Sequence, residues 1–397
     1  MRIVMFYHTL ISDWNHGNAH FLRGIVSELL ARGHSVDVFE PEDAWSLKNL
    51  LQEHGEEPVR EFEAAYPGLR SRRYDLNRID LTRVLEGVDL VIVHEWNAPE
   101  LVKRIGERRA RVGRFKLFFH DTHHRMITAP ESMAAYDLRH YDGVLAYGKV
   151  LEEMYQRSGR VKNAWTWHEA ADTRRFRPVA NDGGPGDLVW VGNWGDGERT
   201  AELDEFLIQP VKALGLKARV YGVRYPAEAR QALEQAGIEY GGWLPNFEAP
   251  AVFAQFKCTV HIPRRPYVKA LPGIPTIRVF EALACGIPLV CSPWEDAEGL
   301  FRPGRDFLMA RNGAEMAKQL REVTHDAELR RDLAANGLET IFEHHTCAHR
   351  VDELLAICEE LKLPRNDCAR LTPASSQLGK HRVKESEQEL CANVETI

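Results

Sequence analysis

Short apolar runs alternate with amphipathic helical stretches along most of the chain, and this alternation constrains the fold more than any other feature. The first series has an apolar run at residues 3–7, apolar residues at helical spacing over 21–30, and a second run at 36–39. A strand, a helix and a strand in this order predict a βαβ unit with a parallel sheet. Further runs of the same kind follow at 90–93, 116–119 and 144–147.

The pattern starts again after residues 179–187, a stretch rich in Gly, Asn, Asp and Pro that is typical of a linker. We therefore predict an α/β protein with two domains, residues 1–175 and 185–345, and this number fits a chain of 397 residues. The second series has apolar runs at 188–191, 218–221, 258–262 and 289–291, and predicted helices that include 199–214 and 276–285.

The end of the chain departs from this pattern. Residues 346–362 are predicted to form an amphipathic helix that could cross back to the first domain. Residues 364–397 are rich in Ser, Gln, Glu, Lys and Asn and show little periodicity, so we expect a disordered tail.

Charge and cysteine content narrow the classes of function. The sequence has 51 Lys and Arg residues and 58 Asp and Glu residues, so its formal net charge is −7. This negative net charge argues against a protein that coats nucleic acid. A pocket for an anionic small molecule needs only a few local cations. The seven cysteines include no C-x-x-C pair, so they predict neither a zinc site nor a disulfide framework and favour a reducing compartment.

The beginning of the chain does not have the pattern of a signal peptide, and no apolar run approaches the roughly 18 residues of a membrane span. We therefore expect a cytoplasmic protein without a transmembrane segment.

The most informative segment is residues 273–290, in which Gly and Pro precede a predicted helix that begins near Thr276. The first N–H groups of a helix and its positive dipole end favour an anion such as a phosphate. Glu281 lies further along this helix, where its carboxylate can accept two hydrogen bonds from a ribose diol. The segment therefore predicts a nucleotide diphosphate site, and the alternative is an Arg278–Glu281 ion pair on a solvated helix face.

The loop after the first predicted strand contains Gly17 and Asn18. Gly17 would let the backbone approach a phosphate closely, and the next helix would add its dipole. The alternative is a simple turn in which Asn18 is the N-cap. No G-x-G-x-x-G motif is present, so a nicotinamide cofactor has no support.

His120 and Asp121 directly follow the predicted strand at 116–119, at the edge where open α/β sheets bind ligands. Such a pair can act as a base or orient an acceptor hydroxyl. Alternatively, the two residues cap the next helix. His123 and His124 extend the cluster, but residues so close in one loop seldom point at one ion, and we predict no metal site.

Arginines would stabilise the charge that develops on a departing diphosphate. Each candidate could instead be a surface or structural arginine. The candidates are Arg224, Arg264, Arg265 and Arg278.

Residues 280–290, Phe-Glu-Ala-Leu-Ala-Cys-Gly-Ile-Pro-Leu-Val, resemble the donor-site motif of GT-B glycosyltransferases. Residues 167–178 resemble the crossover into the second domain of that superfamily, and 23–36 resemble its opening R-G-L…R-G-H-x-V pattern. Three further stretches resemble the spore-maturation CgeB-like branch, namely 119–125, 191–194 and 273–278.

The resemblance implies a GT-B fold, with two Rossmann-like domains facing each other across a cleft. It implies a hexosyltransferase-type enzyme that moves a sugar from a nucleotide diphosphate-sugar co-substrate to an unidentified acceptor, without a bound metal or other cofactor. The resemblance also implies that Glu281 binds the donor ribose and that Gly192 and Asn193 hold the donor. It implies that Trp243 and Leu244 lie in a loop that cradles the nucleotide base.

One position departs from the family pattern. Family-four enzymes usually carry a second Glu eight residues before the ribose-binding one, and here that residue is Gly273. The family's usual contact between this second Glu and the transferred sugar therefore has no side chain to make it here, and backbone N–H groups around Gly273 and Ile274 could substitute.

Two other functions fit the same architecture. One is a nucleotide-sugar epimerase of the non-hydrolysing type. The other is a non-catalytic sugar-binding protein with two lobes, against which the missing signal peptide counts.

Overall fold

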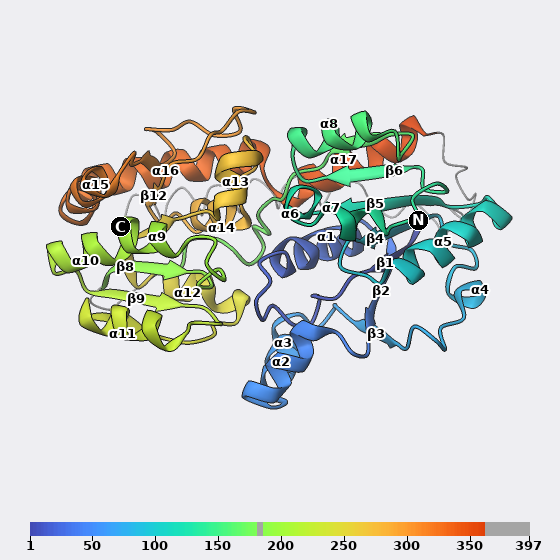
Figure 1. The fold of residues 1–397 in the computed structure, drawn as a ribbon, viewed down its shortest axis with the longest axis horizontal. Helices are drawn as coiled ribbons and strands as arrows, with labels where there is room; N and C mark the ends of the chain where they lie inside the picture. Colours follow the sequence, from blue (N-terminus) through green and yellow to red (C-terminus); the bar gives the residue numbers. More distant parts are fainter. Residues whose placement is uncertain (181–185, 362–397) are drawn as a thin grey trace, which may run out of the picture.

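The computed structural model describes residues 1–180 and 186–361. The predicted tail at 364–397 and the centre of the predicted linker at 179–187 lie outside these residues. Two lobes lie side by side, each built on one parallel sheet (Figure 1). We call them the N-terminal lobe, built on strands β1–β7, and the C-terminal lobe, built on β8–β13.

Within residues 1–180 and 186–361, the sheet of the N-terminal lobe has seven strands in the order β3-β2-β1-β4-β5-β6-β7, and every pair is parallel. Its central strands are buried except for the first residues of β1 and β5, because helices cover both faces of the sheet (Figure 1). The strands are β1 (Arg2–Phe6), β2 (Ser35–Pro41), β3 (Ser71–Tyr74), β4 (Leu90–His94), β5 (Lys116–Asp121), β6 (Gly143–Ala146) and β7 (Ala164–Thr166).

The sheet of the C-terminal lobe has, in the part of the chain that the structure describes, six parallel strands in the order β10-β9-β8-β11-β12-β13. In each sheet the first strands are added toward one edge and the later strands toward the other edge. This switch in strand order lies between β1 and β4 in the first lobe and between β8 and β11 in the second. Ligands of open α/β sheets bind at such switch points, beyond the carboxyl ends of the strands. The strands are β8 (Gly186–Val191), β9 (Ala218–Tyr221), β10 (Ile238–Tyr240), β11 (Phe256–His261), β12 (Leu289–Cys291) and β13 (Leu308–Met309).

The helices connect these strands. Those of the N-terminal lobe are α1 (Ala19–Ala31), α2 (Trp45–His54), α3 (Glu57–Ala65), α4 (Leu81–Val84), α5 (Pro99–Val112), α6 (Arg125–Thr128), α7 (Pro130–Ala134) and α8 (Lys149–Ser158). The later ones are α9 (Thr200–Leu203), α10 (Gln209–Leu214), α11 (Ala227–Gln235), α12 (Ala249–Phe253), α13 (Arg265–Ala270), α14 (Ile277–Ala284), α15 (Gly313–His325), α16 (Ala327–His344) and α17 (Cys347–Glu360).

The last helix of the described residues, α17, returns to the N-terminal lobe. α16 packs against α14, whereas α17 packs against α1 and lies over the N-terminal lobe in Figure 1. Thr346 caps α17, and its hydroxyl accepts a hydrogen bond from the His349 N–H. The Trp167 indole N–H also donates to the Arg350 carbonyl oxygen at 2.8 Å, so α17 is fastened to the first lobe.

The differences from the sequence expectations have physical causes. The apolar runs predicted the central strands, but β3, β7, β10 and β13 were missed because they are edge strands of only two to four residues. The helix predicted over 199–214 is divided into α9, a π-helical turn over Asp204–Ile208, and α10. Pro210 lacks the N–H that a continuous α-helix would need at this point. No helix of residues 1–180 and 186–361 is long and apolar enough to cross a membrane.

Candidate active site

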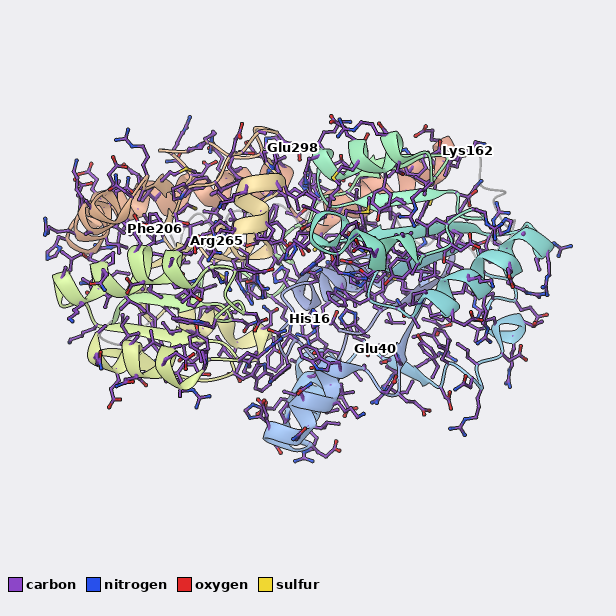
Figure 2. The ribbon with its side chains drawn as sticks, viewed as in Figure 1. His16, Glu40, Lys162, Phe206, Arg265 and Glu298 are labelled. Atoms are coloured by element: carbon purple, nitrogen blue, oxygen red, sulfur yellow. The ribbon has the colours of Figure 1, made fainter. Side chains whose placement is uncertain are left out.

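A cavity of about 790 Å3 lies where the carboxyl ends of both sheets face each other. On the N-terminal side its wall includes His8, which follows β1, and Trp96, which follows β4. On the C-terminal side the wall includes Gly192 after β8 and Ile262 after β11. Both switch points therefore open into one cavity, and Figure 2 shows His16, another wall residue, where the two lobes meet.

The start of α14 forms part of the C-terminal wall. Thr276 is the N-cap residue, but its hydroxyl is 3.0 Å from His261 Nε2 and makes no capping bond to the helix. Ile277 and Arg278 line the cavity beside it. A Cβ on Gly17 would lie 2.6 Å from Cγ2 of Ile277, so a glycine is needed for the first lobe to approach this helix end. The arrangement leaves N–H groups and a positive dipole end at the cavity.

Most of the predicted donor residues come together in this cavity. Asn18 is the N-cap residue of α1, but its side chain donates to the Thr122 hydroxyl instead of capping the helix. Asn193 accepts a hydrogen bond from the Val223 N–H at 2.9 Å and donates to the Asn15 side chain of the other lobe. The predicted residues that line the cavity are Gly17, Asn18, Gly192, Asn193, Arg224, Arg264, Thr276 and Arg278.

Among the described residues, four arginines line the cavity, and three of them have carboxylate partners. Arg224 pairs with Asp196 at 2.9 Å, Arg264 pairs with Glu198 at 2.8 Å, and Arg278 pairs with Glu281.

The fourth arginine, Arg199, was missed in the sequence. Its guanidinium donates to the carbonyl oxygens of Ile262 and Asn193, and it lies 5.0 Å from the centre of the Trp190 ring. Its Nε has no hydrogen-bond partner among the residues that the structure describes. Burial lowers the pKa of Arg199 to about 9, which leaves it cationic at neutral pH. Its place just after the glycine-rich turn that follows β8 is the signal that could have identified it.

Aromatic side chains form the N-terminal side of the cavity. Trp45 and Trp96 are 46% and 39% exposed, which is unusual for tryptophan in a folded domain. The His16 ring stands edge-on to both, with ring centres 6.1 and 5.8 Å apart. His123 lies 5.4 Å from Trp96, and its Nδ1 has no hydrogen-bond partner within residues 1–180 and 186–361. Burial lowers the pKa of His123 well below its usual value, so the ring is neutral.

His120 and Asp121 are buried beneath the cavity wall and do not line it. His120 Nδ1 is 2.7 Å from the Tyr7 hydroxyl, and burial lowers the pKa of His120 to about 3. Asp121 accepts hydrogen bonds from the Tyr155 hydroxyl at 2.7 Å and from the His123 N–H at 3.2 Å. The pair therefore holds the segment that carries His123.

Glu281 is also fully buried and does not line the cavity. Its carboxylate accepts from Asn246 Nδ2 at 2.7 Å, lies 3.3 Å from His20 Nδ1 and pairs with Arg278. The Arg278–Glu281 ion pair of the alternative interpretation is present, but its carboxylate is buried instead of solvated.

Three other predicted residues lie away from the cavity. Arg265 pairs with Glu202 at 2.7 Å. The Trp243 indole N–H donates to Asp13 at 3.0 Å, a bond that joins the two lobes, and Leu244 packs against the hydrophobic core.

Glu169 belongs to the cavity wall, whereas the backbone at Gly273 does not line the cavity. Glu169 lines the cavity although it is only 3% exposed, and it was not among the residues predicted for the site. The N–H of Gly273 donates to the Glu295 carbonyl oxygen at 2.7 Å and that of Ile274 points to the Leu271 carbonyl oxygen at 3.4 Å, so both are engaged. Across residues 1–180 and 186–361, no three His, Cys, Asp or Glu side chains form a group that could hold a metal ion.

Most of the C-terminal lobe resembles a known protein family. Residues 199–356 match the family model described as "Glycosyl transferase-like". No curated protein sequence matches the chain.

Solved structures match over nearly the whole chain. Sucrose-phosphate synthase from Thermosynechococcus elongatus has a TM-score of 0.62 at 15% identity, covering 91% of this chain and 99% of its own. An α-glucosyltransferase in complex with UDP-glucose and DNA has a TM-score of 0.66 at 13% identity, covering 90% and 99%. The T4 phage enzyme BGT, in complex with its UDP-glucose substrate, has 0.58 at 14%, covering 91% and 100%.

These likenesses confirm the expected GT-B fold. Nothing in them supports the narrower resemblance to the CgeB-like branch.

Proposed function

We propose that this protein is a glycosyltransferase that moves a hexose from a nucleoside diphosphate-sugar donor to an acceptor, with both substrates held in the cavity between the lobes. The observation that carries the proposal is the cavity itself. It joins the start of α14 and the arginines of the C-terminal lobe to an aromatic wall of the N-terminal lobe. The family match over residues 199–356 covers most of the donor side.

The donor diphosphate fits against the start of α14. Backbone N–H groups there can donate hydrogen bonds to a phosphate oxygen, and Arg199 offers a cation that forms no ion pair with a carboxylate of the described residues. Charge grows on the diphosphate as the sugar leaves, so both groups act more strongly in the transition state than in the bound substrate. We place no metal ion in this step.

Glu281 reaches a donor ribose only if the α14 region rearranges, because its carboxylate is fully buried. We propose that it contacts the ribose in the donor complex and that Arg278 and Asn246 hold it in place until then.

The acceptor fits the aromatic wall. The face of an indole ring is electron-rich and suits the C–H groups of a sugar ring or the face of another flat molecule. Trp45 and Trp96 supply two such surfaces. Nδ1 of the neutral His123 can accept a hydrogen bond from the acceptor hydroxyl. Asp121 acts through His123, because it holds the backbone of that residue.

The test is incubation with a panel of UDP-, GDP-, ADP- and dTDP-hexoses, with and without mixed glycan, lipid and small-molecule acceptors. Chromatography would separate the nucleoside diphosphate, the free sugar and any epimer of the donor. A glycosyltransferase releases nucleoside diphosphate faster when its acceptor is present. Formation of an epimer without acceptor would instead support a nucleotide-sugar epimerase, and binding without any turnover would support a sugar-binding protein.

A further inference from the structure

Glu169 is a buried carboxyl group at a place where a negative charge would oppose the proposed ligand. It lines the same cavity as Thr276, Ile277 and Arg278, which form the start of α14. Its Oε1 atom has no hydrogen-bond partner among the described residues, although the residue is only 3% exposed. A buried polar atom without a partner is costly, and in a ligand site it is normally satisfied by the ligand.

The groups that face Glu169 come from three further segments. From α14, the Ile277 N–H and the Arg278 guanidinium favour the carboxylate, whereas the charge of Glu281 opposes it. Tyr147, after β6, and Tyr267, on α13, also lie near Glu169.

Burial is the largest influence on Glu169 and raises its pKa to about 8. Burial also raises the pKa of both tyrosines well above the usual value, so they stay neutral. The carboxyl group is therefore mostly protonated at neutral pH, and it can donate one hydrogen bond as well as accept one.

We propose that Glu169 belongs to the donor site and contacts the nucleoside diphosphate as a neutral carboxylic acid, donating a hydrogen bond from its free oxygen to a diphosphate oxygen. This inference rests on the proposed function, in which the cavity takes a nucleoside diphosphate. The ligand brings negative charge close to Glu169 and raises its proton affinity further. Binding at a pH near 8 then takes a proton from solvent onto the carboxylate.

The direction of the pH effect follows from this arrangement. Only the protonated form of Glu169 fits an anionic ligand, so affinity falls as the pH rises through the pKa of the free protein. The second ionisation of a terminal phosphate has a pKa near 6 and is about 90% complete at pH 7. The ligand charge therefore changes by only about a tenth of a unit between pH 7 and pH 9, where the affinity changes.

The experiment is calorimetric titration of the protein with UDP, GDP, ADP and dTDP at pH 7, 8 and 9, comparing wild type with Glu169→Gln and Glu169→Ala. Wild type should lose about tenfold in affinity between pH 7 and pH 9, as expected when only the acid form of a group with a pKa of about 8 binds. At pH 8 the heat should depend on the ionisation enthalpy of the buffer and report uptake of about half a proton.

The two variants separate the hydrogen bond from the charge. Glu169→Gln keeps a neutral donor of nearly the same shape, so its affinity at pH 7 should lie within about threefold of wild type and stay constant to pH 9. Glu169→Ala should bind about tenfold more weakly at pH 7, also without a pH dependence. Melting temperatures of all three proteins show whether each variant is folded.

Three results would count against the inference. A nucleotide that binds wild type with no fall in affinity up to pH 9 would overturn it and leave the proposed function intact. An equal fall in wild type and Glu169→Gln would assign the titration to another group and overturn it as well. If no nucleotide binds folded wild-type protein at pH 7, the proposed function itself fails.

Discussion

His20 Nδ1 lies 3.3 Å from Glu281 Oε1, and both side chains are fully buried. His20 belongs to α1 of the N-terminal lobe, and Glu281 belongs to α14 of the C-terminal lobe. His20 Nε2 accepts a hydrogen bond from the Asp172 N–H at 2.7 Å, so the proton of a neutral ring is on Nδ1 and faces Glu281. The helix that begins at the proposed donor site is thus tied to the first helix of the other lobe.

Loss of this carboxylate should destabilise the protein. In Glu281→Ala the Asn246 amide and the His20 ring lose a buried partner, and a buried polar group left unsatisfied costs about 1–3 kcal/mol. Thermal unfolding of the variant should occur several degrees below that of wild type. Glu339→Ala removes a half-exposed ion pair with Arg302 and should change the melting temperature much less. Equal melting temperatures for the two variants would show that Glu281 has no such role.

Arg199 should carry more of the nucleotide affinity than any arginine outside the cavity. Arg199→Ala removes a cation whose hydrogen bonds to phosphate are worth about 1.5–3 kcal/mol, or roughly 10- to 100-fold in affinity. Arg265→Ala is the matched control, because Arg265 lies on α13 outside the cavity and pairs with Glu202. Calorimetric titration with the best-binding nucleoside diphosphate measures both. The assignment is wrong if Arg265→Ala weakens binding as much as Arg199→Ala.

His123 should affect transfer and leave donor binding unchanged. His123→Ala removes the unpartnered nitrogen that faces the acceptor side, so we expect kcat for transfer to fall about tenfold or more. The affinity for nucleoside diphosphate should stay within about twofold, since the phosphate site is on the other lobe. The control is the exposed His140, whose replacement by alanine should change neither quantity. A loss of nucleotide affinity in His123→Ala would move this residue to the donor site.

Acid should destabilise the fold through its buried histidines. Burial lowers the pKa of His120 to about 3, below its value of about 6.5 in an unfolded chain. The unfolded state then binds more protons at low pH, so this contribution is full above about pH 6.5 and is lost as the pH falls toward 3. Each pH unit in that window costs up to about 1.4 kcal/mol for the group.

His120→Gln can keep the hydrogen bond to Tyr7 but cannot titrate. Its melting temperature should therefore fall less than that of wild type between pH 7 and pH 5. Parallel curves for the two proteins would place the acid sensitivity elsewhere.

Sequence patterns predicted the layout of the protein better than the positions of its site residues. The apolar runs give the central strands because those strands are buried on both faces, and glycine and proline mark the start of α14. The same patterns cannot tell which side of a strand end faces the ligand. His120 and His123 illustrate this limit. His120 lies in β5 and is buried, whereas His123, two residues after the end of β5, lines the cavity.

Contacts between the two lobes could not be predicted from the sequence either. Glu281 and His20 are in contact although about 260 residues separate them in the sequence, and no local pattern of residues predicts such a pair. Glu169 and Arg199 were missed for a related reason: each gains its importance from neighbours on other segments. Residue types at strand ends are therefore good candidates for a site, while their roles depend on packing that only the structure provides.

The most direct test of the central claim is a thermal-shift titration of the full chain with UDP, GDP, ADP and dTDP and their hexose conjugates. Ligand at about 100 times its Kd stabilises the folded state by about 2.7 kcal/mol, which gives a clear rise in melting temperature. We predict such a rise with at least one nucleoside diphosphate and its sugar conjugate, and a much smaller rise in Arg199→Ala. No rise with any nucleotide at millimolar concentration would contradict the account.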